Sequence, residues 1–138
     1  MIVDTSALAA IAMAELHWEG LLAALADSEC VVPAPVLTEL QLAMPKRGPR
    51  IAAAAIALVE RLLDAGATIV PFEHRHALIT AAARDRFGKG NGSGGKLNFG
   101  DLMVYAIAKD RRQPLLCTGN DFASTDLEIH PASRLDPE

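Results

Sequence analysis

Short apolar runs alternate with longer stretches of helical periodicity along most of the chain. Four runs rich in aliphatic and β-branched residues predict strands, at residues 1–3, 30–32, 68–70 and 113–117. Apolar residues spaced three and four positions apart predict helices between them, at residues 7–13, 16–26, 36–44, 50–65, 74–87 and 99–108. A last short edge strand is expected over residues 127–130. Strands that alternate with helices are typical of an α/β fold with a parallel sheet and right-handed crossovers.

Length and composition favour one globular domain over residues 1–138. A chain of 138 residues is long enough to bury a proper core. Hydrophobic residues make up 51% of it and charged residues 22%, a balance that excludes an intrinsically disordered protein. No apolar run reaches the roughly 18 residues of a membrane span, and the first residues do not form a signal sequence. We therefore expect a soluble, cytoplasmic protein with no membrane partner.

The cysteines and histidines do not indicate a zinc site. Cys30 and Cys117 each lie inside a predicted strand, where a free thiol acts as a small apolar side chain. They form no Cys-x-x-Cys motif, and the four histidines lack zinc-ligand spacing. His74 and His76 would face different sides of their predicted helix, and we interpret them as surface or capping residues.

Four acidic residues lie at the ends of predicted elements, beside apolar segments. Asp4 and Asp121 directly follow strands, and Asp101 is the third residue of a helix that Asn98 caps. Glu39 lies on or beside the inward face of its helix, where a carboxylate is unfavourable unless something positive meets it. Each acid also has a purely structural explanation: a helix cap, a stabilised helix terminus, a border side chain that reaches water, or a turn residue.

The predicted topology brings these four acids together. The carboxyl ends of parallel strands gather at one edge of a sheet, where open α/β folds place their ligands. Four carboxylates at one edge would repel one another strongly unless a hard cation lay among them. Oxygen ligands with water positions left open suit Mg²⁺ or Mn²⁺. The sequence therefore predicts a Mg²⁺ or Mn²⁺ site at this edge.

Basic residues are clustered although the formal net charge is -4. The main cluster surrounds the glycine-rich stretch 88–96, which is expected to be a flexible loop; its members are Arg84, Arg86, Lys89 and Lys96. Such a cluster can contact the phosphates of RNA, or it can simply be a solvated basic face. The stretch has no Gly-x-x-x-x-Gly-Lys-[Ser/Thr] pattern, so a phosphate-cradling P-loop is not expected.

Four short motifs occur in a fixed order along the chain. They are Asp4-Thr5-Ser6-Ala7, Thr38-Glu39, Leu97-Asn98-Phe99-Gly100-Asp101 and Thr118-Gly119-Asn120-Asp121-Phe122. Together they resemble the ordered motifs of the PIN domain and, more narrowly, those of VapC-type toxins from toxin–antitoxin modules. The resemblance covers essentially the whole chain. Many relatives carry Arg-His-Pro after a Gly-Lys-Gly like that at 88–90, whereas this chain has Asn91-Gly92-Ser93-Gly94, so the resemblance leaves the RNA contacts of this loop open.

The resemblance implies a three-layer α/β/α fold around a central, mainly parallel sheet of four to five strands. It also implies a Mg²⁺- or Mn²⁺-dependent endoribonuclease. Carried over motif by motif, the acidic quartet is Asp4, Glu39, Asp101 and Asp121. Three of these, Asp4, Asp101 and Asp121, are expected to ligate the metal, Glu39 to act through water, and Ser6 and Thr118 to orient carboxylates or water. Water as the nucleophile, in place of the ribose 2′-OH, predicts products with 5′-phosphate and 3′-OH ends.

The implied partners are RNA, often transfer or ribosomal RNA, a cognate VapB-type antitoxin, and a second copy of the chain in a homodimer. The antitoxin is expected to insert a basic side chain among the acids while a short amphipathic helix fills an apolar groove.

Two other functions remain open on the sequence. A phosphotransferase of the haloacid dehalogenase kind also begins with a strand that ends in aspartate, but it needs a second aspartate two positions later, where this chain has Ser6. A catalytically silent PIN-like module would only bind RNA or a protein. The presence of all four acids argues against that module, and a metal titration would distinguish it from an enzyme.

Overall fold

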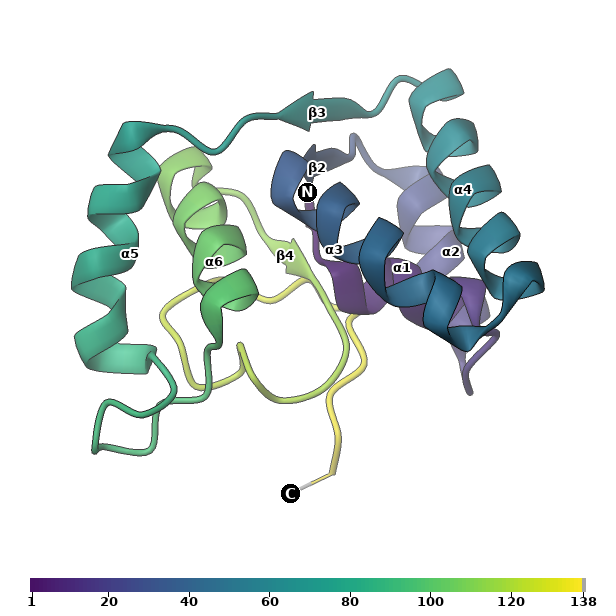
Figure 1. The fold of residues 1–138 in the computed structure, drawn as a ribbon. Coiled ribbons are helices and arrows are strands. Elements are labelled where there is room, and N and C mark those ends of the chain that lie inside the picture. Colours follow the sequence, from purple (N-terminus) through teal and green to yellow (C-terminus); the bar gives the residue numbers. More distant parts are fainter. Residues whose placement is uncertain (138) are drawn as a thin grey trace.

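Four short parallel strands form the central sheet of the computed structural model, which describes residues 1–137 (Figure 1). Their order across the sheet is β3-β2-β1-β4. Their bounds are Ile2–Val3 for β1, Val31–Pro33 for β2, Thr68–Val70 for β3 and Leu115–Leu116 for β4. Ile2 pairs with Val31 on one side and with Leu115 on the other, so the amino-terminal strand lies inside the sheet. Continuous apolar strands of this kind require cover on both faces.

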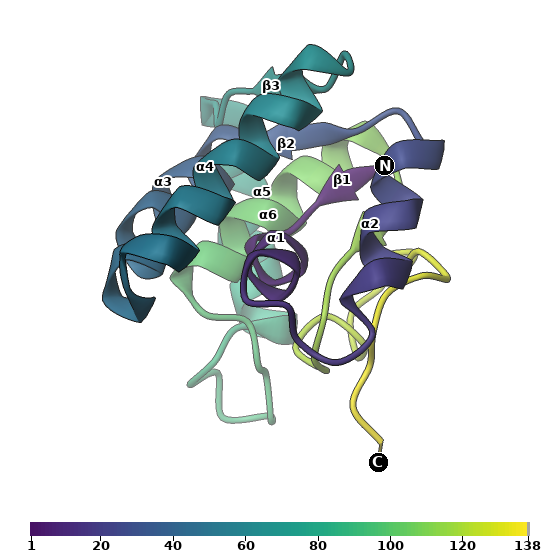
Figure 2. The ribbon, with the colours of Figure 1, turned by 90° about the vertical axis from the view of Figure 1, so that its right-hand side faces the viewer.

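Helices supply that cover in two groups. The first group connects β1 to β2 and β2 to β3: α1 (Thr5–Ala12), α2 (Trp18–Asp27), α3 (Ala34–Ala43), a 3₁₀ turn (Met44–Arg47) and α4 (Pro49–Asp64). The second group connects β3 to β4: α5 (His74–Phe87) and α6 (Phe99–Arg111). Figure 1 shows α5 and α6 at the left of the sheet and the first group at the right, and Figure 2 shows the first group from the front. The three-layer α/β/α arrangement is therefore confirmed.

The direction of the chain across the sheet reverses between β1 and β4. From β1 the connections lead outward through β2 to β3, and the α5–α6 connection then returns to place β4 on the free side of β1. Such a reversal opens a crevice at the carboxyl ends of the two strands between which it occurs, β1 and β4. The backbone N–H of Asp4 still donates to the carbonyl of Leu116 at 3.0 Å, so the strands stay paired up to Asp4, the residue that caps α1.

Several predicted elements are confirmed, and two details are wrong. The helix over 74–87 has its predicted bounds, and the expected edge segment pairs with β4 through a bridge between Leu115 and Ile129. Leu16 does not belong to a helix and is 77% exposed, because left-handed residues on either side of it turn the chain before α2 begins. His76 caps α5 as expected, since its Nδ1 accepts the Glu73 N–H at 2.9 Å, but it is buried, so the alternative that it is a surface residue is wrong.

Cys30 and Cys117 are buried free thiols, as expected. Across residues 1–137, no helix combines the length and the apolar character that crossing a membrane requires.

Candidate functional site

Asp4 lies at the junction of β1 and α1, at the crevice between β1 and β4. Its Oδ2 accepts hydrogen bonds from the backbone N–H of Ser6 at 3.1 Å and from the Ser6 hydroxyl at 2.5 Å, so the expected helix-cap role is real. Burial nevertheless raises the pKa of Asp4 above its ordinary value, the bonds from Ser6 oppose this, and the charge of Glu39 adds to the rise. Ser6 Oγ also accepts the Thr118 N–H at 3.0 Å, which ties the end of β1 to the loop after β4.

Asp101 occupies the third position of α6 and forms a reciprocal capping box with Asn98. The Asp101 N–H donates to Asn98 Oδ1 at 2.8 Å, and Asp101 Oδ2 accepts the Asn98 N–H at 3.1 Å. A carboxylate that served only this helix terminus would have a lowered pKa. Instead the pKa of Asp101 is raised to about 7, first by burial and then by the charges of Asp4, Asp121 and Glu39, which outweigh the Asn98 bond. The helix terminus alone does not account for this residue.

Glu39 approaches the same place from α3. Its side chain is exposed, and its Oε2 lies against α6, only 2.6 Å from the position that a Cβ on Gly100 would occupy. The carboxylate can lie there only because residue 100 has no side chain. Gly100 is thus a residue of the site that was not predicted from the sequence; the signal for it was a glycine inside the first turn of a helix, directly before an acid.

Asp121 lies exposed in the turn that follows β4. The pKa of the buried Cys117 thiol is raised to about 12, first by burial and then by the charges of Asp4, Asp101 and Asp121, while a hydrogen bond from Ser133 opposes the rise. Three carboxylates from three separate segments therefore act on the end of β4. Together with Glu39 they form the acidic quartet of this chain, at the edge of the sheet where the sequence predicts it.

The quartet has the donor chemistry of a hard-cation site but an open arrangement. Within residues 1–137, none of the four carboxylates is paired with a lysine, arginine or histidine. In the same part of the chain, no three histidine, cysteine or acidic side chains are gathered as tightly as ion ligands. Like charges without a cation repel, so an open arrangement is what the electrostatics favour. Oxygen donors of this kind fit Mg²⁺ or Mn²⁺.

The four basic residues singled out in the sequence do not all remain available. Arg84 pairs with Asp85 at 3.3 Å, and Arg86 approaches Asp126 at 3.5 Å and lies over the ring of Phe87. Lys89 and Lys96 are exposed in the loop between α5 and α6. Hydrogen bonds close the base of this loop, from the Lys89 N–H to the Leu97 carbonyl at 2.8 Å and from the Leu97 N–H to the Phe87 carbonyl at 3.0 Å. The closed loop ends just before α6, the helix that carries Asp101.

Comparisons with known proteins agree with this architecture. The family model of the PIN domain matches residues 1–127. Ribonuclease VapC36 of Mycobacterium tuberculosis is 42% identical over 133 residues, which cover 94% of this chain and 92% of that protein. Among solved structures, FitAcB from Neisseria gonorrhoeae is similar with a TM-score of 0.68 and 21% identity, covering 95% of this chain and 96% of that one. VapBC2 from Rickettsia felis, bound to a DNA fragment from its promoter, is similar with a TM-score of 0.67 and 18% identity, covering 98% and 96%.

Proposed function

The chain belongs to the PIN-domain family, and on that premise we propose that it is a metal-dependent endoribonuclease, the toxin of a toxin–antitoxin pair. The observation that carries the proposal is the meeting of four carboxylates from four segments, without basic partners among residues 1–137, at the switch point of the sheet. The pKa of Asp101, raised to about 7, indicates a place where negative charge is unfavourable until a cation binds. The similarity to Ribonuclease VapC36 supports ribonuclease chemistry at such a site.

The residues present can hold an ion without losing their structural bonds. Asp4 and Asp101 use Oδ2 for the bonds to Ser6 and Asn98, which leaves Oδ1 of each carboxylate for an ion. Asp121 is the third proposed ligand. A bound Mg²⁺ or Mn²⁺ would lower the pKa of a water molecule and neutralise charge on the reacting phosphate.

The remaining parts of the site position water and RNA. Glu39 is proposed to hold and orient a water, because its exposed carboxylate lies at the edge of the quartet against Gly100. Ser6, through its bond to Thr118, keeps the two strand ends aligned. An RNA backbone is itself negative and needs basic partners near the acids. Lys89 and Lys96 are proposed to supply them, since the two nearby arginines already face carboxylates.

The test of this function is cleavage of a small-RNA pool by the purified, antitoxin-free chain with Mg²⁺, with Mn²⁺ and with excess EDTA. We expect fragments with 5′-phosphate and 3′-OH ends in either metal, because the proposed nucleophile is water, and no cleavage in EDTA. Sequencing of the product ends shows which end groups the fragments carry and in which of the three reactions cleavage occurs. Cleavage that persists in EDTA would reject the metal mechanism, and a folded chain that cuts no RNA with any metal would indicate the silent binding module.

We also propose that two copies of the chain form a homodimer. A groove of about 720 Å³ beside the quartet is lined from α3, α6 and the segment after β3, and it includes Glu39 and Gly100. On its rim, Phe99 is 81% exposed and Leu42 is 67% exposed. Large apolar side chains left open in this way are typical of interaction surfaces. We assign the groove to a second copy of this chain, and light scattering that reads the 14.6 kDa mass of one chain would reject the assignment.

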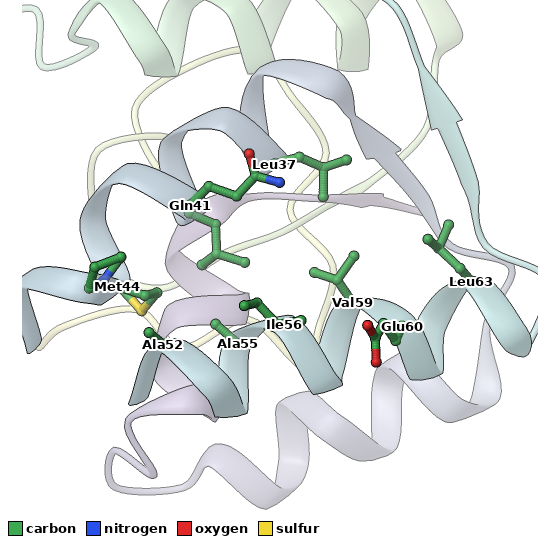
Figure 3. A pocket seen from close by; sticks show the side chains of 11 residues that line it. Leu37, Gln41, Met44, Ala52, Ala55, Ile56, Val59, Glu60 and Leu63 are labelled. Carbon is green, nitrogen blue, oxygen red and sulfur yellow. The ribbon is translucent and has the colours of Figure 1, made fainter. Parts of the chain in front are cut away.

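The antitoxin is proposed to occupy a different groove, between α3 and α4. This groove encloses about 550 Å³, and its lining is almost wholly apolar apart from Gln41 and Glu60. Leu37 on α3 faces Ile56 and Val59 on α4 across it (Figure 3). An amphipathic helix fits such a groove. Because α3 also carries Glu39, one partner could fill the groove and reach the quartet. The similarity to VapBC2 of Rickettsia felis supports a VapB-type partner.

Ile56→Glu should weaken the binding of a co-purified VapB-type antitoxin by at least about tenfold. The bound antitoxin would bury the glutamate, which would lose its hydration without gaining an ion pair or a hydrogen bond. Ile56 is 57% exposed in the chain alone, so the variant should fold and cut RNA normally. The matched control is Ala57→Glu, since Ala57 is exposed on α4 and does not line the groove. Calorimetric titration measures the affinity. Equal affinities for the two variants would place the antitoxin elsewhere.

A further inference from the structure

The segment after residue 132 runs beside the loop that carries Thr118 and Asp121. The Gly119 N–H donates to the Arg134 carbonyl at 2.8 Å, and the Arg134 N–H donates to the Cys117 carbonyl at 3.0 Å. These bonds form a parallel bridge between Thr118 and Arg134. In Figure 1 the yellow carboxyl-terminal segment lies alongside the chain that leaves β4. The segment therefore adds a short edge to the sheet where the quartet lies.

Asn120 makes the closest link between this segment and the acids. Its Nδ2 donates to the Asp136 carbonyl at 3.1 Å, and its Oδ1 accepts the Asp136 N–H at 3.0 Å. One side-chain amide thus satisfies both backbone groups of a single residue, which fixes its orientation. Gly119, with φ of 77°, makes the left-handed turn that presents Asn120 to the segment. Asn120 directly precedes Asp121, so a fixed Asn120 restricts where Asp121 can lie.

The segment is itself anchored at two further points. Ser133 Oγ accepts the Cys117 N–H at 3.1 Å and donates to the Leu115 carbonyl at 3.2 Å. The side chain of Arg134 reaches back to Glu15, with Nη2 and Oε2 3.1 Å apart. The loop after β4 is consequently held on one side by Ser6 and on the other by residues 133–136. The stretch that matches the PIN family model ends at residue 127, so this anchor lies outside it.

We propose that residues 133–136 are a positioning segment for Asp121 and that Asn120 is the positioning residue through which they act. The inference rests on the proposed function, because Asp121 is a proposed metal ligand. Asp121 is exposed, and the neighbouring carboxylates repel it toward solvent. Without the bonds to Asn120, the loop would spend less time with Asp121 in the quartet. Ion binding and turnover would weaken, while RNA affinity, which depends on the basic loop before α6, would not.

The test compares three variants with the wild-type chain. Asn120→Ala removes both bonds to Asp136, and a chain that ends at Ser133 removes the segment beyond its first anchor. Leu135→Ala is the control, because Leu135 lies in the same segment and is 47% exposed. For Asn120→Ala we expect Mn²⁺ affinity and kcat to fall by roughly three- to tenfold, with KM for RNA and the unfolding temperature unchanged. The shortened chain should lose at least as much, and Leu135→Ala should match the wild type.

Mn²⁺ affinity is measured by calorimetry without RNA, so this readout does not depend on cleavage. If the wild type cuts RNA and Asn120→Ala equals it in Mn²⁺ affinity and kcat, the inference fails and the proposed function stands. If the wild type cuts no RNA, the proposed function fails, and the Mn²⁺ titration still decides: weaker binding by Asn120→Ala supports the inference, and equal or absent binding rejects it. If the shortened chain does not fold, Asn120→Ala alone decides.

Discussion

Asp101→Asn is expected to reduce RNA cleavage by at least about 100-fold while the protein stays folded. Asparagine has the size of aspartate, and its side-chain oxygen can still accept the Asn98 N–H, which Asp101 Oδ2 accepts at 3.1 Å. The capping box of α6 therefore survives, whereas the proposed ion site loses one of its anionic ligands. Cleavage of the small-RNA pool in Mg²⁺ measures the first effect, and far-ultraviolet circular dichroism checks the fold.

The same substitution should stabilise the metal-free protein near pH 8. Burial, followed by the charges of Asp4, Asp121 and Glu39, raises the pKa of Asp101 to about 7 in the folded state. An unfolded aspartate has a pKa of about 4. The folded state thus holds this proton more tightly, so the stabilisation is complete below about pH 4 and is lost as the pH rises through about 7. Asparagine never acquires the charge, and Asp101→Asn should therefore flatten the fall in unfolding temperature between about pH 5 and about pH 8 in EDTA.

Asp64→Asn is the control for both effects, because Asp64 is an exposed aspartate at the end of α4, outside the quartet. It should cut RNA as the wild type does and keep the pH dependence of the wild type. A folded Asp101→Asn protein with normal cleavage would remove Asp101 from the site. A wild type whose stability does not fall toward pH 8 would show that Asp101 does not carry the raised pKa.

Much of this structure could be predicted where neighbouring residues decide it. Asn98 and Asp101 are three positions apart, and their capping box depends on that spacing alone, so the start of α6 could be predicted from the sequence. The same holds for α5, whose apolar spacing gives its bounds. Asp4 and Asp121 follow strands, and parallel strands end at one edge, so the meeting of the acids follows from topology.

Contacts between distant segments could not be predicted in this way. The hydrogen bonds of Asn120 with Asp136 and of Arg134 with Glu15 join residues that are far apart in the sequence. Neither helical nor strand periodicity relates these positions, so the sequence pattern does not predict the bonds. Asp126 is a further example: it accepts the hydroxyl of Tyr105 at 2.6 Å and pairs with Lys109 at 2.7 Å, which fixes the chain after Asp121 to α6. The prediction that Leu16 lies in a helix is wrong for the opposite reason. Its apolar character fits a helical stripe, but left-handed backbone around it overrides that pattern.

Gly100→Ala is expected to lower RNA cleavage by about tenfold or more without destabilising the protein. A Cβ at position 100 would lie 2.6 Å from Glu39 Oε2, so the carboxylate must move away from α6. The end of a glutamate side chain moves easily, so the fold tolerates the change, and alanine in place of glycine favours the helix by up to about 1 kcal/mol. Stability and activity should therefore move in opposite directions. Thermal unfolding and RNA cleavage measure the two effects on the same preparation.

Gly20→Ala separates the helix effect from the site effect. Gly20 lies in α2, and a Cβ there meets nothing within 4 Å, so this control should gain stability and cut RNA normally. A double-mutant cycle then tests whether Gly100 acts through Glu39. If the glycine serves only to admit that carboxylate, Gly100→Ala adds little to the loss already caused by Glu39→Gln, because the second change displaces a group that no longer functions. If the losses of activity in the two single variants add fully in the double variant, Gly100 and Glu39 act independently. Gly100 would then not serve the site by admitting the Glu39 carboxylate against α6.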